Sequence, residues 1–187
     1  GDRKFIKIGF LLLENGQTLS DITIAYQTWG TLNAACDNAI LIQHAMTGWS
    51  DVPGWWPNMV GPGLAFDTNK YFVVCPNVIG GCQGSTGPSS IAPDGKRYGS
   101  RFPSVTIRDM VAAEIAFSDA IGIKKYKLAV GPSLGGMRSL EWAVDHPDRV
   151  ESICTIGSSA VATGDQIGTA SIQIRAIKAD PHFNNGD

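Results

Sequence analysis

The chain has 187 residues, of which 43% are hydrophobic and 17% are charged, and its formal net charge is −2. This composition is typical of a single globular domain, and a chain of this length can bury a sizeable core. The near-neutral charge, without a cluster of Lys or Arg, argues against binding to nucleic acid or to acidic membranes. The sequence also shows neither a transmembrane stretch nor the apolar region of a signal peptide.

The four cysteines are widely spaced and form no C-x-x-C pair. They are Cys36, Cys75, Cys82 and Cys154. Cys75 and Cys154 fall inside apolar, strand-like segments, where buried free thiols are expected. Reduced thiols favour a cytoplasmic location. With three histidines and no His/Cys cluster, the sequence predicts no metal site and no resident cofactor.

An antiparallel hairpin is predicted at the start of the chain. Residues 5–13 and 22–29 have strand patterns, and Glu14-Asn-Gly-Gln17 between them suits a tight turn, because Asn-Gly tolerates positive φ. Short, continuous apolar runs then predict buried strands of a mostly parallel sheet covered on both faces. These runs are residues 39–45, 71–77, 127–130 and 150–156.

Helical patterns alternate with these strands, which argues for an α/β fold. Thr106-Ile-Arg-Asp109 resembles a capping box and predicts the start of the first helix, and Gly122 marks its end. His146-Pro147 ends the second. Between strand and helix signals, a long ordered loop is expected over residues 78–104. The three predicted helices cover residues 107–121, 134–144 and 166–178.

The most informative motif is Gly131-Pro-Ser-Leu-Gly135, a G-x-S-x-G between a predicted strand and a predicted helix. Such a turn needs glycines because a side chain at either flank would collide with neighbouring backbone. It holds the Ser133 hydroxyl above a sheet edge and leaves the Leu134 N–H free at a helix N-terminus, where it can stabilise an oxyanion. The motif predicts nucleophilic acyl transfer; the alternative is a Gly-rich turn that only joins strand to helix.

A second oxyanion donor is expected from the loop after the third predicted strand, the one that begins at residue 39. Here that loop is His44-Ala-Met-Thr-Gly48, and the Met46 N–H is the candidate. His44 is expected to fix this loop rather than to act as a base.

The sequence offers no general base for Ser133. His146 lies about 20 Å from Ser133 along the same predicted helix, at ~1.5 Å per residue, and His182 falls in the tail. In G-x-S-x-G enzymes of this architecture the acid and the histidine follow the serine in chain order. The residues after Ser133 contain a single strand signal, so we expect neither partner in this chain.

Two other segments have residue types that can serve in ligand binding. Gly80-Gly-Cys-Gln-Gly-Ser-Thr-Gly-Pro88 lacks the Lys of a P-loop and the glycine spacing of a dinucleotide fingerprint. A rigid loop beside the active site is therefore preferred over a phosphate cradle. Trp49, Trp55 and Trp56 are expected to pack a loop onto the core, with an acyl or pantetheine channel as the alternative.

Several motifs together resemble the homoserine O-acetyltransferase family, from about residue 20 to the end. They are Gly61-Pro-Gly63, residues 71–90, Phe102–Met110, Leu140–Val144, residues 44–48 and the Ser133 turn. The resemblance implies an α/β-hydrolase fold, with the N-terminal part of the core domain in residues 1–163, the start of a helical lid in residues 164–187, and an end before the family's last strands. The family's catalytic Asp and His, and its carboxylate-binding Arg, belong to a later portion.

The resemblance also implies the reaction. Acetyl-CoA, as substrate, acylates Ser133, and the hydroxyl of L-homoserine then takes the acetyl group in a ping-pong step of methionine biosynthesis. Met46 and Leu134 match the oxyanion donors. Pro132 replaces the family's usual Gly, and Leu134 replaces Met. A homodimer is a candidate assembly.

Three alternatives to this function stay open. The same serine chemistry serves an esterase or a thioesterase, with water as acceptor. The donor could be succinyl-CoA and the acceptor serine. The third alternative is a non-catalytic chain, because the acid and the base are missing.

Overall fold

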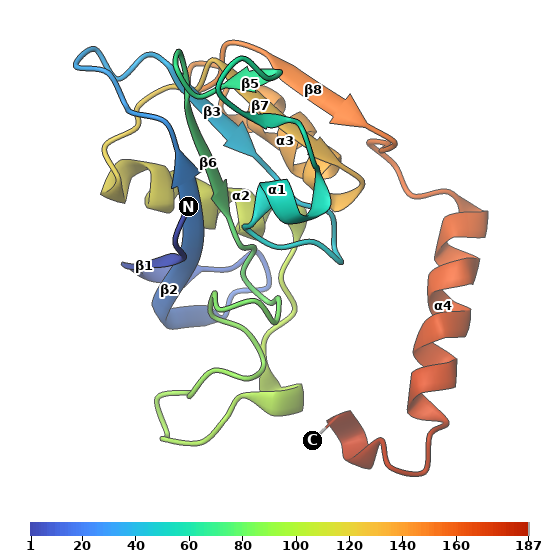
Figure 1. The fold of residues 1–187 in the computed structure, drawn as a ribbon. Coiled ribbons are helices and arrows are strands. Elements are labelled where there is room, and N and C mark those ends of the chain that lie inside the picture. The colour runs from blue at the N-terminus through green and yellow to red at the C-terminus, as the bar shows by residue number, and fades with distance from the viewer. Residues whose placement is uncertain (187) are drawn as a thin grey trace.

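The computed structural model describes residues 1–186 and is built on a six-stranded sheet of order β1-β2-β6-β3-β7-β8 (Figure 1). The strands are β1 (Lys4–Leu12), β2 (Thr18–Trp29), β3 (Ala39–Ile42), β6 (Phe72–Pro76), β7 (Leu128–Pro132) and β8 (Ile153–Ile156); β4 (Val60–Gly61) and β5 (Phe66–Asp67) form a separate pair. The helices are α1 (Val52–Trp55), α2 (Ile107–Ala120), α3 (Leu134–Asp145) and α4 (Gly164–Lys178), with short 3₁₀ turns η1 (Gly99–Arg101) and η2 (Asn184–Gly186).

The predicted hairpin and parallel sheet are confirmed. β1 pairs antiparallel with β2, and Gly16 in the turn between them has a φ of 82°. β2 joins β6 in an antiparallel pair, whereas β6, β3, β7 and β8 run parallel. In a parallel sheet the carboxyl ends of the strands meet at one edge, which is where α/β proteins place their sites.

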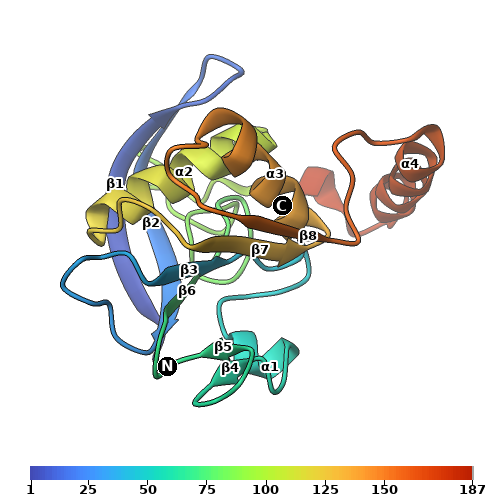
Figure 2. The ribbon, with the colours of Figure 1, turned by 90° about the horizontal axis from the view of Figure 1, so that it is seen from above.

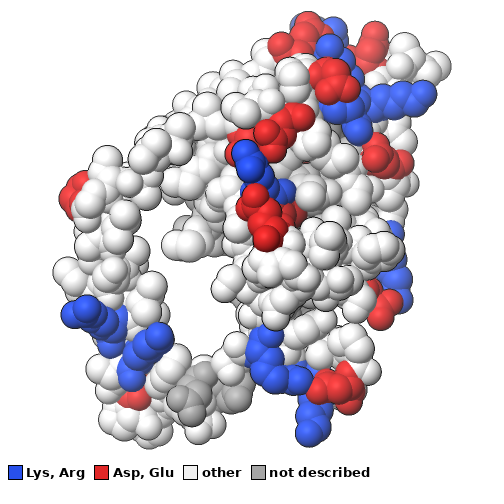
Figure 3. Space-filling view, turned by 180° about the vertical axis from the view of Figure 1, so that it is seen from behind, with Lys and Arg blue, Asp and Glu red and all other residues white. Residues whose placement is uncertain are grey.

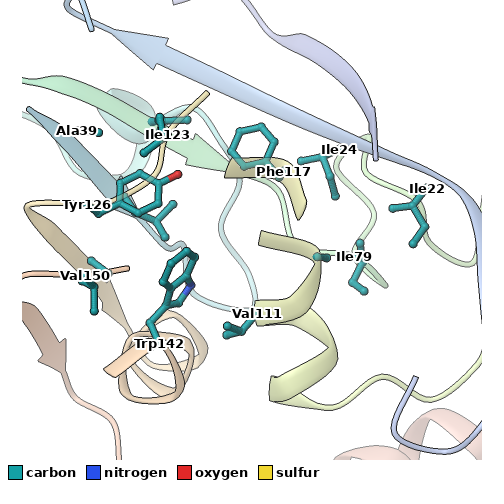
Figure 4. Packing of buried hydrophobic residues seen from close by; sticks show 14 of the residues in the cluster. Ile22, Ile24, Ala39, Ile79, Val111, Phe117, Ile123, Tyr126, Trp142 and Val150 are labelled. Atoms are coloured by element: carbon teal, nitrogen blue, oxygen red, sulfur yellow. The ribbon is translucent and has the colours of Figure 1, made fainter. Parts of the chain in front are cut away.

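The sheet is covered on both faces (Figure 2). α2 and α3 cover one face, where buried side chains such as Phe117, Tyr126 and Trp142 form the larger apolar cluster (Figure 4). On the other face, the segment with α1, β4 and β5 packs against Ile40, Ile42 and neighbouring side chains. Burial of apolar surface on both faces explains why the strands read as continuous apolar runs.

α2 begins as its sequence predicts. The Thr106 hydroxyl accepts from the Asp109 N–H, and the Asp109 carboxylate accepts from the Thr106 N–H, which completes a capping box. The Asp109 carboxylate also accepts from the Glu14 N–H at 2.9 Å. This side chain therefore fixes the turn of the β1–β2 hairpin against the helix.

Several expectations were wrong in detail. The strand predicted over residues 22–29 begins at Thr18, and the strand predicted over residues 150–156 begins at Ile153. The strand predicted over residues 39–45 ends at Ile42, because the chain turns away from the sheet into the loop that follows. Cys154 is exposed rather than buried, because it lies on the face of β8 opposite to Ile153, which packs into the α2–α3 cluster. Cys75 is buried as expected, and burial raises the pKa of its thiol to about 12.

α4 stands apart from the sheet and its covering helices (Figure 1). None of its residues is buried, and Ile167, Ile174 and Ile177 are exposed. The helix predicted over residues 166–178 is thus present with two further residues at its start. Its assignment to a lid stays a prediction, and Asp187, the last residue of that segment, lies outside the described residues.

Candidate active site

Ser133 lies at the junction of β7 and α3 in a backbone conformation that side-chain-bearing residues rarely adopt. Its φ is 52° and its ψ is −120°. Such a conformation persists only where the surroundings fix it. Here the Ser133 N–H donates to the Ile156 carbonyl at 2.9 Å, and the Ser133 carbonyl accepts from the Met137 N–H at 3.1 Å and from the Ser158 hydroxyl. The turn is therefore held from both sides, and the Ser133 residue is exposed.

The glycines of the motif allow this turn to pack directly against the end of β3. A Cβ at Gly131 or at Gly135 would collide with the Gln43 carbonyl oxygen. A Cβ at Gly136 would collide with the Ser158 hydroxyl. The strand–turn–helix context of a nucleophile elbow is thus present, with close backbone approach as the physical reason for its glycines.

The two candidate oxyanion donors lie at the same edge of the sheet. β3 and β7 are parallel neighbours, with Ile42 opposite Val130, so the loop after β3 and the turn after β7 leave the sheet side by side. Neither the Met46 N–H nor the Leu134 N–H has a hydrogen-bond acceptor among the described residues. The Met46 side chain is 75% exposed. Both N–H groups are thus free to serve a ligand.

His44 anchors the loop that carries Met46. Its ring contacts the Ala45 carbonyl through Nδ1 at 2.6 Å and accepts from the Val78 N–H through Nε2 at 3.1 Å. Burial, together with the positive charge of Arg138, lowers the pKa of His44 to about 4. A neutral ring with its proton on Nδ1 satisfies both contacts, as expected for a residue that fixes the loop.

A buried polar network lies directly behind the loop and the elbow. The Arg138 guanidinium donates to the Glu114 carboxylate at 2.5 Å and to the His44 carbonyl at 2.6 Å. The other Glu114 oxygen accepts from the Gln43 amide at 2.6 Å and from the Trp142 indole at 2.7 Å. Helices α2 and α3 are thereby joined to the end of β3 by charge-assisted hydrogen bonds.

The sequence predictions do not include this network. A signal was available, because Glu114 interrupts the apolar stripe of the predicted helix over residues 107–121. Arg138 likewise lies one helical turn before Trp142. A charged residue on the buried face of an amphipathic helix indicates a buried partner.

A pocket of about 400 Å³ opens beside the loop of residues 44–48. It is lined on one side by His44, Met46 and Thr47, and on the other by Val78 and residues 80–83. The Gly80–Pro88 loop is joined to β2, because the Thr86 N–H donates to the Thr23 carbonyl at 2.9 Å. Within the loop, the Thr86 carbonyl accepts from the Gly80 N–H at 2.9 Å. This supports the interpretation of a rigid wall beside the site.

The tryptophans pack rather than line this pocket. Trp55 and Trp56 stack with ring centroids 5.5 Å apart, and Trp56 meets Phe66 edge-on at 5.7 Å. The Trp55 indole donates to the Trp49 carbonyl at 2.7 Å. None of the three tryptophans lines the pocket, so the packing interpretation is the one that the structure supports.

The histidines are placed as expected. His44 faces the Ala45 carbonyl and the Val78 N–H, His146 follows the last turn of α3, and His182 is exposed and lies 3.3 Å from the Asp180 carboxylate. Within residues 1–186, the Ser133 hydroxyl has no hydrogen-bond partner. The described residues therefore supply a candidate nucleophile and two candidate backbone donors, but no base in contact with the serine. None of their helices is long and apolar enough to cross a membrane.

Comparison with known proteins identifies the fold. A family model described as the alpha/beta hydrolase fold matches residues 38–187. The solved structure of homoserine O-acetyltransferase from Bacillus anthracis superposes with a TM-score of 0.93 at 31% identity, over 100% of this chain and 54% of that one. An acetylester hydrolase from Corynebacterium glutamicum superposes with a TM-score of 0.91 at 34% identity, over 100% of this chain and 53% of that one.

A curated relative is more similar in sequence. Homoserine O-acetyltransferase from Thermobifida fusca (strain YX) is 49% identical over 198 residues, which covers 100% of this chain and 52% of the relative. The chain spans about half the length of the curated relatives it matches. The likeness therefore extends over the whole of this chain and over about half of each of these relatives.

Proposed function

The chain belongs to the alpha/beta hydrolase fold family, and on that premise we propose that it carries the nucleophile and the oxyanion hole of a homoserine O-acetyltransferase. The observation that carries the proposal is the elbow. Ser133 is held at a positive φ between β7 and α3, opposite a loop whose Met46 N–H is unpaired within the described residues. The likeness to homoserine O-acetyltransferases at 49% identity supports the choice of acceptor.

The proposed reaction has two halves. The Ser133 Oγ attacks the thioester carbonyl of acetyl-CoA, the C–S bond breaks, and CoA leaves as the thiol. The hydroxyl of L-homoserine then attacks the acetyl-serine ester, and the bond between the Ser133 Oγ and the acyl carbon breaks. In both halves, negative charge on the acyl oxygen is stabilised by the Met46 and Leu134 N–H groups, which are preorganised for it.

The hydroxyl proton of Ser133 must pass to a base, and none of the described residues contacts this hydroxyl as a base. From the resemblance we expect that base, with its acid, in the family's later portion. The reaction would then be a cytoplasmic step of methionine biosynthesis. Whether the protein is a homodimer stays a prediction, and sedimentation of the protein expressed from its complete gene would measure it.

The test is an assay of the protein expressed from its complete gene, with acetyl-CoA, L-homoserine and a thiol reagent. We expect CoA release that depends on homoserine, parallel double-reciprocal plots as for a ping-pong mechanism, and an acetyl group on Ser133 when homoserine is left out. Ser133→Ala is the control and should show none of these. CoA release that is indifferent to homoserine would contradict the proposal.

An acetyl esterase is the second candidate, because the superposed structures include an acetylester hydrolase at a TM-score of 0.91. The elbow and its donors serve both activities, and the difference lies in what attacks the acetyl-serine. With the same protein, hydrolysis of 4-nitrophenyl acetate whose rate is unchanged by added homoserine, and which yields only acetate, would favour the esterase. O-acetylhomoserine as product would exclude it as the sole activity. Succinyl-CoA and L-serine, offered in the same assay, test the remaining donor and acceptor.

A further inference from the structure

A second pocket adjoins the candidate active site, and all of its charged lining residues are cationic. It has a volume of about 570 Å³ and is lined by three cationic side chains, Lys96, Arg97 and Arg101, without an Asp or Glu among its lining residues. Pockets that gather Lys and Arg in this way attract phosphate groups. Apart from Gly186, its lining residues belong to the segment between β6 and α2, which contains neither Ser133 nor the two candidate oxyanion donors.

Two of the three cations are free for a ligand. Arg101 pairs with the Asp94 carboxylate at 2.7 Å and donates to the Arg97 carbonyl at 2.8 Å, so its role is to shape the loop. Within residues 1–186, neither the Lys96 ammonium nor the Arg97 guanidinium has an ion-pair partner, and both residues are exposed. The pocket therefore carries about two uncompensated positive charges.

The pocket is connected to the acyl-transfer site. Pro88 and Ser89 line both the cationic pocket and the pocket beside Met46. The loop that joins them is fixed, since the Gly99 N–H donates to the Pro88 carbonyl at 2.8 Å and the Tyr98 N–H donates to the Ser90 carbonyl at 2.9 Å. Lys96 and Arg97 are thus held in a pocket that is joined, through Pro88 and Ser89, to the pocket beside the loop of residues 44–48.

Further positive charge lies across from this pocket. The last turn of α4 carries Arg175 and Lys178, and Gly186, in the segment after that helix, lines the pocket itself. The space-filling view from behind shows Lys and Arg side chains on α4 and on the facing body of the molecule, at the lower part of the opening between them (Figure 3). Basic side chains thus lie on both sides of the lower part of this opening.

We propose that Lys96 and Arg97 bind the phosphates of the acyl donor's nucleotide, with the uncharged pantetheine arm running past Pro88 and Ser89 to Ser133. This proposal rests on the proposed function and deepens it, since it says where a CoA thioester is recognised. The charges are suited to the part of the donor that carries its phosphates, and the connecting wall at Pro88 and Ser89 presents no charge to the uncharged arm. A donor without the nucleotide should be indifferent to both cations.

The test compares acetyl-CoA with acetyl-pantetheine, which has the same thioester but no phosphates and no nucleotide. In the protein expressed from its complete gene, we expect the double substitution Lys96→Ala/Arg97→Ala to raise the KM for acetyl-CoA about tenfold, the effect of losing two exposed charge pairs. The kcat should not change, and neither should the kinetics with acetyl-pantetheine or 4-nitrophenyl acetate. The KM for acetyl-CoA should also rise with salt in the wild type, and less so in the variant.

Lys125→Ala is the matched control. Lys125 is exposed and precedes β7 at the opposite end of the strand from Ser133, so its loss removes a charge without touching either pocket. The proposal is overturned if the double variant and this control have the same KM for acetyl-CoA, or if acetyl-pantetheine is affected as strongly as acetyl-CoA.

The proposed function fails on a different readout. That failure would be an absence of O-acetylhomoserine from the wild type, whichever donor is supplied. The nucleotide proposal can still be measured in that case, because free CoA should then inhibit the hydrolysis of 4-nitrophenyl acetate. The inhibition should be about tenfold weaker in the double variant, and inhibition of equal strength would overturn the nucleotide proposal.

Discussion

The Arg138 guanidinium donates a hydrogen bond of 2.6 Å to the carbonyl oxygen of His44. Helix α3, which begins directly after the candidate nucleophile Ser133, is thereby joined to the loop that follows β3. Arg138 and His44 are both buried, with exposed fractions of 0% and 2%. Arg138 is in turn paired with Glu114 at 2.5 Å. The position of the Met46 N–H relative to Ser133 thus depends on a buried charge pair.

Removing Arg138 should be costly for stability. Arg138→Met leaves the Glu114 carboxylate buried without its cation, and we expect a loss of about 3–5 kcal/mol in the free energy of unfolding. Urea denaturation of the protein expressed from its complete gene measures it. Arg108→Met is the control, because Arg108 pairs with Glu141 at 2.7 Å but is 57% exposed, and about 1 kcal/mol or less should be lost there.

A double substitution separates the contribution of the Glu114–Arg138 charge pair to stability from the contribution of side-chain packing. Glu114→Gln/Arg138→Met removes both charges, so it should cost less than the sum of the two single variants. Strict additivity, or an Arg138→Met variant as stable as Arg108→Met, would show that the buried pair does not hold this region.

The elbow serine should be essential for acyl transfer and unfavourable for stability. Ser133→Ala and Ser133→Gly both lose the acyl-enzyme, because neither has a nucleophile. Glycine adopts a φ of 52° without a Cβ penalty, so Ser133→Gly should be more stable than Ser133→Ala by about 1 kcal/mol, after allowance for the greater entropy of its unfolded chain. Thermal denaturation gives the difference, and equal stability would mean that the turn is unstrained.

Gly135 should tolerate no side chain. Gly135→Ala places a Cβ against the Gln43 carbonyl, which must push α3 away from the oxyanion loop. We expect a loss of about 1–3 kcal/mol and a fall in kcat of about a hundredfold, the usual cost of a 1 Å misplacement.

Gly168 in α4 provides the matched control for this glycine. A Cβ there meets nothing within 4 Å. Gly168→Ala should therefore keep full activity and gain up to about 1 kcal/mol from helix propensity. Similar effects of the two substitutions would refute the close-approach argument.

Acid should destabilise the protein through His44. The pKa of His44 in the folded state, about 4, lies below the ordinary histidine pKa of 6.5, so between these pH values the unfolded chain binds the extra proton. Stability from this group is complete above about pH 6.5 and is lost as pH falls towards 4, at a total cost of about 3 kcal/mol. Urea denaturation at pH 7 and pH 4.5 measures the loss. In His44→Gln the acid-dependent part should shrink by this amount; an unchanged pH dependence would mean that another group is responsible.

The parts that the sequence predicted are those encoded locally. The G-x-S-x-G motif carries its own strand, turn and helix signals, and the Asn15-Gly16 turn carries its own hairpin signal. His44 could be assigned to the loop because it follows directly on a buried strand. The Glu114–Arg138 pair joins two helices, and no local sequence pattern predicts how these helices pack against each other. The exposure of Cys154 depends on what lies over β8, and an apolar run alone does not say which of its faces is covered.

The order of the strands determines when the site can form. β3 and β7 are neighbours in the sheet but far apart in the chain, and β6 enters the sheet on the other side of β3. Such pairings have a high contact order, so their loop-closure entropy is lost before their contacts form. The candidate oxyanion donors Met46 and Leu134 therefore come together only once the centre of the sheet is complete. Recovery of acyl-transfer activity on refolding should follow sheet assembly and lag behind the appearance of helix.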